Sequence, residues 1–144
     1  MTIKGDQLTA DFTGVSPQVP APVNSTLAVT AASVFITLKS VLDPKHALNH
    51  GSFRPVTVIA PEGTIVNVTH PAPAGSHGEI RKRVIACMLG ALSQICPELI
   101  SADIHRTSFH NLIGGIDPKT GREFVHYEWS AGGLSLIHIS EPTR

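Results

Sequence analysis

Two stretches of the chain repeat hydrophobic residues at the spacing of an amphipathic helix. The first is predicted over residues 26–42, with Asn24 or Ser25 as N-cap and Asp43-Pro44 at its end. The second is predicted from Gly78 to Ile95, and Pro97 stops it. The apolar stripes are Leu27, Ala31, Val34, Phe35, Leu38, Val41 and Leu42 in the first helix, and Ile80, Val84, Cys87, Met88, Ala91, Leu92 and Ile95 in the second.

Shorter alternating stretches predict strands. In residues 6–13, Leu8, Ala10 and Phe12 share one face, and a connector with Pro17, Pro20 and Pro22 follows. The other predicted strands are Val56–Ala60 and Thr64–Val68 around the turn Pro61-Glu62-Gly63, and Thr107–Ile113 and Arg122–Trp129 around Asp117–Gly121. Residues 70–75 are too rich in proline for regular structure. The expected fold class is α+β: two helices packed on a mixed sheet of short strands and hairpins, as part of a larger domain.

Composition narrows the function classes. The 144 residues are 42% hydrophobic and carry 11 basic and 11 acidic side chains, which gives no footprint for nucleic acid or an anionic membrane. No secretory signal opens the chain, and the stretch Leu27–Leu42 is too short to span a bilayer, so we expect a cytoplasmic location. Cys87 and Cys96 are about 13 Å apart along one helix, too far for a disulfide, and are interpreted as small buried hydrophobes.

The end of the chain differs from the rest. Residues 134–144 read Leu-Ser-Leu-Ile-His-Ile-Ser-Glu-Pro-Thr-Arg, which resembles a translated sequencing-library adaptor. We therefore expect residues 134–144 to be a non-native tail and residues 1–133 to be a partial, internal portion of a domain.

The sequence holds no strong catalytic motif. It lacks a phosphate-binding loop, a dinucleotide fingerprint, a Cys-x-x-Cys pair and a nucleophile elbow, and Gly114-Gly115-Ile116-Asp117 is interpreted as a strand-end turn. Asp103 and His105 would share a strand face that His126 could approach. Histidines are interpreted as structural or solvated, since none shows the tight helical His-x-x-x-His geometry of a zinc site. Outside the tail they are His46, His50, His70, His77, His105, His110 and His126. The run Arg81-Lys82-Arg83 is interpreted as a solvated face.

The densest polar cluster is Asn49-His50-Gly51-Ser52-Phe53-Arg54, in a loop between a helix and a strand. Gly51 permits either a positive φ or a close backbone approach, and Arg54 offers a planar fork for a carboxylate, phosphate or amide oxygen. The alternative is that Asn49 and Arg54 only satisfy backbone carbonyl groups. The residue types leave both interpretations open.

Several short sequence motifs occur in a characteristic order. They are Asp11-Phe12-Thr13-Gly14, Pro22-Val23-Asn24, Asn49-His50-Gly51-Ser52-Phe53-Arg54-Pro55, Pro61-Glu62-Gly63-Thr64 with Asn67, Pro71-Ala72-Pro73, Gly114-Gly115, and Tyr127-Glu128 with Gly132-Gly133. Their order and spacing resemble the hydantoinase B/oxoprolinase family, specifically an N-methylhydantoinase B-type subunit, over residues 5–133.

The resemblance implies that the intact protein is a hydrolase acting on C–N bonds of cyclic amides, opening hydantoin or 5-oxoproline rings. An A-type ATP-binding subunit or domain would activate the amide by phosphorylation, in a hetero-oligomer. ATP on that partner and a divalent metal elsewhere in the subunit are implied, and no metal ligand or cofactor site is assigned to this chain.

The same resemblance leaves two alternatives: a component of an ATP-dependent ketone carboxylase, or a non-catalytic scaffold or subunit-contact segment. The matching positions that become candidate site residues are Asp11, Asn24, Asn49, Gly51 and Arg54. This segment alone is expected to be inactive, because an incomplete site does not hold its groups in productive geometry.

Overall fold

The computed structural model describes residues 1–100, 106 and 108–131. The chain divides into two compact units, Met1–Asp103 and Ile104–Arg144. Asp103 and His105, which the sequence suggested as part of a histidine-bearing strand face, lie outside the described residues, as do the suspected tail and the Gly132-Gly133 phrase.

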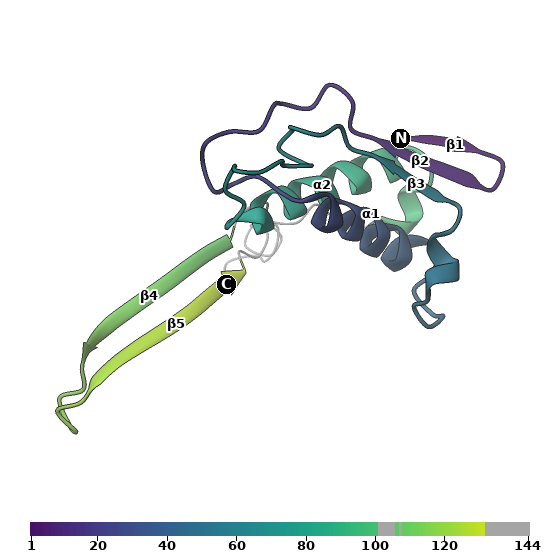
Figure 1. The fold of residues 1–144 in the computed structure, drawn as a ribbon. Helices are drawn as coiled ribbons and strands as arrows, with labels where there is room; N and C mark the ends of the chain where they lie inside the picture. The colour runs from purple at the N-terminus through teal and green to yellow at the C-terminus, as the bar shows by residue number, and fades with distance from the viewer. Residues whose placement is uncertain (101–105, 107, 132–144) are drawn as a thin grey trace, which may run out of the picture. The chain divides into compact units, whose positions relative to one another are not determined.

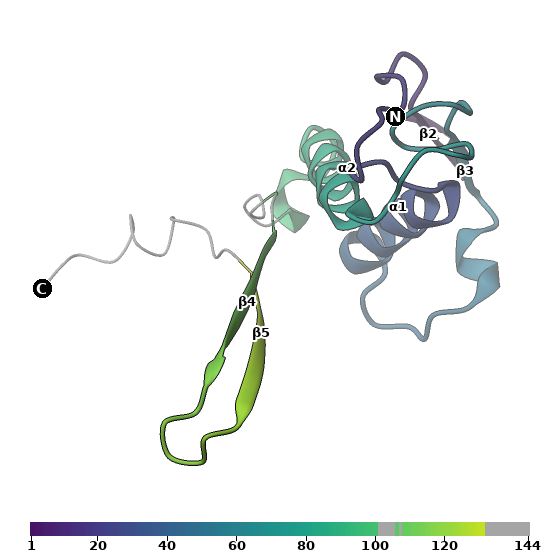
Figure 2. The same cartoon turned by 60° about the vertical axis from the view of Figure 1, so that its left-hand side comes forward.

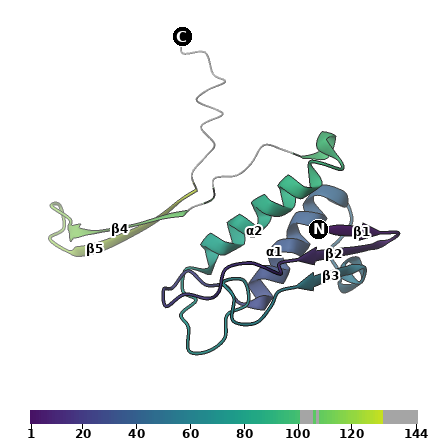
Figure 3. The ribbon, with the colours of Figure 1, turned by 90° about the horizontal axis from the view of Figure 1, so that it is seen from above.

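The first unit contains a three-stranded sheet in the order β1-β2-β3 (Figure 1 and Figure 3). β1 (Thr2–Lys4) runs antiparallel to β2 (Gln7–Asp11), and β2 runs parallel to β3 (Val56–Ile59). The alternation predicted for β2 is confirmed, because Leu8 and Ala10 are buried while the strand ends are exposed. The sequence did not predict β1, since all three of its residues are exposed and no hydrophobic alternation marks it.

The connection from β2 to β3 contains α1 (Leu27–Leu42), which confirms the helix predicted over residues 26–42. The predicted N-cap is wrong. The cap is Thr26, whose hydroxyl accepts a hydrogen bond from the amide of Val29. Asn24 and Ser25 are completely buried, and hydrogen bonds to neighbouring loops hold them away from the helix end.

The buried face of α1 carries more hydroxyl groups than its hydrophobic pattern suggested. Its buried residues are Thr30, Ser33, Val34, Thr37 and Leu38. The Thr30 hydroxyl donates to the carbonyl oxygen of Val66 at 2.6 Å, and the Ser33 and Thr37 hydroxyls donate to carbonyl groups four residues earlier. These bonds satisfy the hydroxyl groups, so they are buried without an unpaired polar atom. Leu27 and Leu42, at the two ends of the predicted stripe, are exposed.

Beside α1 lies α2 (His77–Leu92), as the turned view shows (Figure 2). It begins one residue before the predicted start and ends three residues before Ile95, which is exposed. Arg81 and Arg83 are exposed, but Lys82 is only 9% exposed. The interpretation of the basic run as a solvated face is therefore wrong for Lys82, which lies one helical turn before the buried Ala86.

The two cysteines are free thiols in different environments. Cys96 is partly buried, and its thiol donates to the carbonyl oxygen of Leu92 at 3.4 Å. Cys87 is exposed, so the expectation that it packs as a buried hydrophobe is wrong. It lies beside the buried stripe of α2 and not within it.

One hydrophobic core joins the sheet and both helices. It comprises Leu8, Ala10, Val34, Leu38, Val66, Ile80, Val84, Met88 and Leu92. Most of these residues occupy the periodic positions from which the elements were predicted, which explains why α1, α2 and β2 were recognisable in the sequence.

The predicted strand Thr64–Val68, and with it the hairpin to β3, is wrong. Isolated bridges replace a continuous ladder in this segment. The amide of Ile65 donates to the carbonyl of Ser16, and the amide of Val68 to that of Ser25. The backbone groups of this segment are thus bound by the preceding proline-containing loop and are not available to β3.

The second unit contains an antiparallel hairpin of β4 (Ser108–Ile116) and β5 (Glu123–Ala131), drawn as two long arrows in Figure 1. The predicted connection over residues 117–121 is confirmed. The expected turn at Gly114-Gly115 is wrong, because both glycines pair within β4. A Cβ atom at Gly115 would lie 3.1 Å from the ring of Phe124, so the missing side chain makes room for this ring.

The predicted α+β class is confirmed, with two helices packed against the three-stranded sheet in the first unit and a hairpin in the second. No helix among the described residues is long and apolar enough to cross a bilayer.

Candidate functional site

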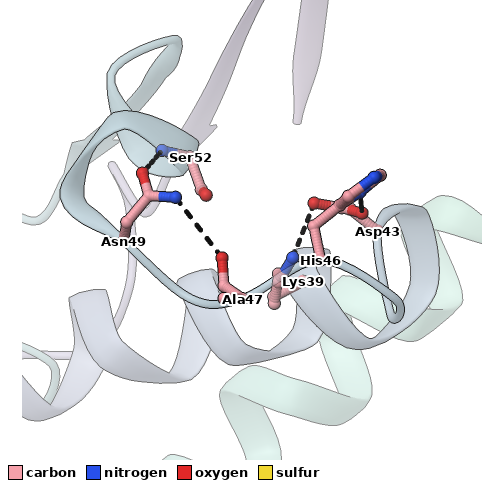
Figure 4. A network of polar contacts seen from close by, with 6 residues as sticks. All are labelled: Lys39, Asp43, His46, Ala47, Asn49 and Ser52. Atoms are coloured by element: carbon pink, nitrogen blue, oxygen red, sulfur yellow. Dashed lines mark hydrogen bonds and ion pairs between the residues drawn. The ribbon is translucent and has the colours of Figure 1, made fainter.

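The polar cluster between α1 and β3 forms a short 3-10 helix, η1 (His50–Phe53). Asn49 caps it: Oδ1 accepts a hydrogen bond from the amide of Ser52 at 3.2 Å (Figure 4). The Asn49 Nδ2 atom donates to the carbonyl oxygen of Ala47 at 3.3 Å. One side chain therefore fixes both the chain that enters η1 and its first turn.

Gly51 makes the Asn49 cap possible. A Cβ atom at this position would lie 2.9 Å from Asn49 Oδ1, closer than carbon and oxygen atoms approach without displacement. Gly51 is not among the glycines with positive φ, so the sequence-based suggestion of a left-handed conformation is wrong and the alternative, a close approach, is confirmed.

Arg54 immediately follows η1, and its amide donates to the carbonyl oxygen of Gly51 at 3.3 Å. Its side chain is exposed, and within the described part of the chain its guanidinium takes part in no ion pair. The planar donor fork is thus available to a carboxylate, phosphate or carbonyl oxygen.

An aromatic stack anchors η1 to the first helix. The rings of Phe53 and Phe35 lie 4.4 Å apart between centroids at an angle of 19°. Such stacked pairs contribute about 0.5–1.5 kcal/mol beyond the area they bury. The stack therefore fixes the end of η1 on the surface of α1.

A cluster of charged and ionisable side chains lies at the C-terminal end of α1. The ammonium of Lys39 lies 2.5 Å from Asp43 Oδ2, and His46 Nδ1 lies 2.5 Å from Asp43 Oδ1 (Figure 4). Hydrogen bonds from Lys39 first and His46 second lower the pKa of Asp43 to about 2. Sequence reasoning missed this cluster, although the four-residue spacing of Lys39 and Asp43 on a helix was a usable signal.

These elements surround a cavity of about 290 Å³. Its walls come from the β1–β2 hairpin, the last turn of α1 and the segment from η1 into β3. Apolar surface comes from Leu8, Leu38, Leu42 and Phe53, and charge comes from Asp6, Lys39 and Asp43. The cavity is partly open, so a small molecule can reach it from solvent.

The remaining two predicted site residues lie elsewhere. Asp11 ends β2, at the opposite end of the parallel β2–β3 pair from η1. Hydrogen bonds from Thr13 lower the pKa of Asp11, and one of them joins the Thr13 amide to Asp11 Oδ1 at 2.9 Å. Asn24 is fully buried, and its side chain binds backbone groups of Val19, Ala21 and Pro73. The structure therefore brings together only Asn49, Gly51 and Arg54.

The histidines form no cluster in the part of the chain that the structure describes. No group of three or more His, Cys, Asp or Glu side chains there could hold a metal ion. His110 pairs with Tyr127 across the hairpin, with Nδ1 and the phenolic oxygen 2.6 Å apart.

Known proteins resemble this chain in sequence. The family model described as hydantoinase B/oxoprolinase matches residues 1–137. An uncharacterised protein from Methanocaldococcus jannaschii is 39% identical over 92% of this chain and 23% of its own length. A 5-oxoprolinase from Pestalotiopsis fici is 28% identical over 85% of this chain and 9% of its own length.

A solved structure resembles the fold. The crystal structure of an ATP-dependent caprolactamase from Pseudomonas jessenii matches with a TM-score of 0.63 and 29% identity, over 76% of this chain and 19% of that one. The chain thus spans less than a quarter of the length of these relatives. A family match over nearly all of the sequence shows that the chain belongs to the hydantoinase B/oxoprolinase family.

Proposed function

We propose that this chain is part of the B-type component of an ATP-dependent enzyme that hydrolyses cyclic amides. The observation that carries the proposal is the family match over residues 1–137, to which the likeness to an ATP-dependent caprolactamase adds a reaction class. Hydantoin, 5-oxoproline and lactam rings share the amide that such an enzyme must open.

The chemistry of the amide explains the need for ATP. An unstrained amide is a poor electrophile, because its nitrogen lone pair is delocalised into the carbonyl group. Transfer of a phosphoryl group from ATP to the amide oxygen ends this delocalisation and lowers the barrier to addition of water at the carbon. The C–N bond then breaks, with the nitrogen taking a proton, and a second water hydrolyses the resulting acyl phosphate to a carboxylate and inorganic phosphate. We assign the phosphoryl transfer to an A-type partner subunit or domain, and ring opening to the component that contains this chain.

The described residues contribute binding groups to this scheme. Arg54 presents an exposed guanidinium beside η1, and η1 is fixed by the Asn49 cap and the Phe53–Phe35 stack. A guanidinium at a rigid position suits a phosphate or amide oxygen. The side chains of Asp11 and Asn24 bind backbone groups of this chain and receive no step in the reaction.

A divalent metal belongs to the proposed intact component, and none of its ligands is assigned to the described residues. The described residues provide no group of three or more metal-binding side chains, so they do not fit such a site, and no step is assigned to a metal here. ATP belongs to the partner, and a cytoplasmic location would supply it.

The test is turnover by the intact protein, purified with its A-type partner. We expect ring opening of ε-caprolactam, hydantoin or 5-oxoproline only when ATP is supplied, with release of inorganic phosphate. Ring opening without ATP, or none on any of the three substrates, would contradict the proposal.

Two further outcomes separate the alternatives. Product formation that requires bicarbonate and a ketone would instead assign the chain to a carboxylase. Arg54→Ala tests the scaffold alternative, with exposed Arg81→Ala in α2 as the matched control. Loss of turnover in the Arg54 variant alone, with subunit assembly intact, supports a role in the site. Normal turnover with impaired assembly identifies a subunit-contact segment.

A further inference from the structure

We propose that the cavity between the β1–β2 hairpin, α1 and η1 binds the ring of a cyclic amide, with Lys39 and Asp43 recognising the two polar groups of the amide. This inference rests on the proposed function for its ligand class and on the geometry of the cavity for its location.

The size and walls of the cavity favour a small ring. The cavity volume of about 290 Å³ lies just below the roughly 300–1,000 Å³ typical of sites for drug-sized ligands, so the cavity suits a smaller molecule. The buried side chains of Leu8 and Leu38 form part of the apolar wall of the cavity. Phe53 adds an aromatic wall that its stack on Phe35 holds in place. Methylene groups of a lactam ring match such walls, because their transfer from water is favourable.

The polar pair matches the edge of a cyclic amide. A small ring forces its amide into the cis form, so the carbonyl oxygen and the N–H group point to the same side. Recognition of that edge needs one donor beside one acceptor. The Lys39 ammonium and Asp43 Oδ2 lie 2.5 Å apart and both line the cavity.

Each member of the pair keeps hydrogen-bonding capacity. An ammonium group has three donors, and a carboxylate has about four acceptor positions. Lys39 can therefore donate to the ligand carbonyl while it remains bound to Asp43, which can accept from the ligand N–H. The Lys39 side chain is only 13% exposed, so little water competes for its donors.

The same geometry excludes open-chain amides. An unconstrained secondary amide is trans and presents its oxygen and N–H on opposite sides, so it satisfies only one member of the pair at a time. Binding should therefore select the cis amide of a ring over the trans amide of a peptide.

Calorimetric titration of the intact protein with ε-caprolactam, N-methyl-caprolactam and the trans amide N-methylacetamide tests the site. N-methylation removes the lactam N–H group from which the Asp43 carboxylate would accept a hydrogen bond. We expect ε-caprolactam to bind about tenfold more tightly than its N-methyl derivative. Asp43→Ala should remove this preference, which a purely structural role of Asp43 would leave in place.

A second pair of variants tests the location without altering charge. Leu42→Trp replaces a leucine side chain in the wall of the cavity by a larger indole ring, which should abolish detectable binding of ε-caprolactam. Leu48→Trp is the matched control, because Leu48 is exposed and does not line the cavity. Equal binding of ε-caprolactam by both tryptophan variants would overturn the proposed site. So would an Asp43→Ala variant that still prefers ε-caprolactam over N-methyl-caprolactam as strongly as wild type does.

Turnover separates the two proposals. If ATP-dependent ring opening occurs but Leu42→Trp and Asp43→Ala bind and react like wild type, the site is wrong and the proposed function stands. If ε-caprolactam binds with the expected selectivity but no ring opens with ATP and the partner, the site stands and the proposed reaction fails.

Discussion

The side-chain nitrogen Nδ2 of Asn24 donates to the carbonyl oxygen of Pro73, 49 residues later in the chain, at 2.7 Å. The same nitrogen reaches the carbonyl oxygens of Val19 and Ala21, and Asn24 Oδ1 accepts from the Val19 amide. One buried side chain therefore joins the loop before α1 to the loop before α2. Without it, several backbone groups would lose their partners away from water.

Replacement of Asn24 by Ala should lower the free energy of unfolding by roughly 2–4 kcal/mol, because buried donors and acceptors would be left unpaired. Urea denaturation measures the change. Asn49→Ala is the matched control: its hydrogen bonds are exposed, and loss of such a cap costs about 1 kcal/mol. An Asn24 variant no less stable than the Asn49 variant would contradict this assignment.

Replacement of Gly51 by Ala should displace the Asn49 side chain from the amide of Ser52, since the new Cβ atom would lie 2.9 Å from Asn49 Oδ1. We expect a loss of about 1 kcal/mol, the usual contribution of an N-cap. Gly90→Ala in α2 supplies the control, because its Cβ meets no atom within 4 Å. That change should stabilise the protein by about 0.5–1 kcal/mol through helix propensity. The denaturation midpoint should therefore fall in Gly51→Ala and rise in Gly90→Ala.

The hairpin offers a comparison between adjacent glycines. Gly115→Ala should push the Phe124 ring aside, because the new Cβ would lie 3.1 and 3.2 Å from two ring atoms. Gly114→Ala places its Cβ 3.8 Å from the Phe124 carbonyl oxygen, an ordinary contact. Proton chemical shifts of the Phe124 ring should change in the first variant and remain nearly constant in the second. Unchanged shifts in Gly115→Ala would show that the ring does not cover this glycine.

The Lys39–Asp43 pair should persist in acid. The pKa of Asp43 is lowered from 3.8 to about 2, so its carboxylate contributes stability above about pH 3.8 and loses this contribution as pH falls through 2. Carbon-detected NMR should place the midpoint of Asp43 near 2. Lys39→Met removes the largest cause and should raise the midpoint toward the ordinary value. A midpoint that is unchanged in this variant would exclude Lys39 as the cause.

The two thiols should differ in reactivity toward iodoacetamide. Cys87 is exposed, whereas Cys96 is partly buried and donates to the Leu92 carbonyl. Mass spectrometry of the native protein should therefore show Cys87 alkylated first, and Cys87→Ser should remove the fast phase. Faster modification of Cys96 would contradict the exposure of the two side chains.

The spacing of hydrophobic residues along the chain was enough to predict the helices and strands that pack on the hydrophobic core. The four-residue spacing of Val34 and Leu38 in α1, and of Ile80 and Val84 in α2, matches the helical period, so both helices could be predicted from the sequence. The order of short polar and glycine phrases also indicated the family, which the match over residues 1–137 confirms. Both signals are linear, because they depend on spacing along the chain.

Tertiary structure decided the features that depend on distant partners. Asn24 looked like a helix cap, but Pro73 binds it in the folded chain. The segment Thr64–Val68 had the composition of a strand, yet the loop that contains Ser16 and Ser25 binds its backbone. Likewise, the cavity beside Lys39 and Asp43 is formed by three segments that only folding brings together. Hydrogen bonds between residues far apart in sequence leave no periodic trace, so spacing alone does not reveal them.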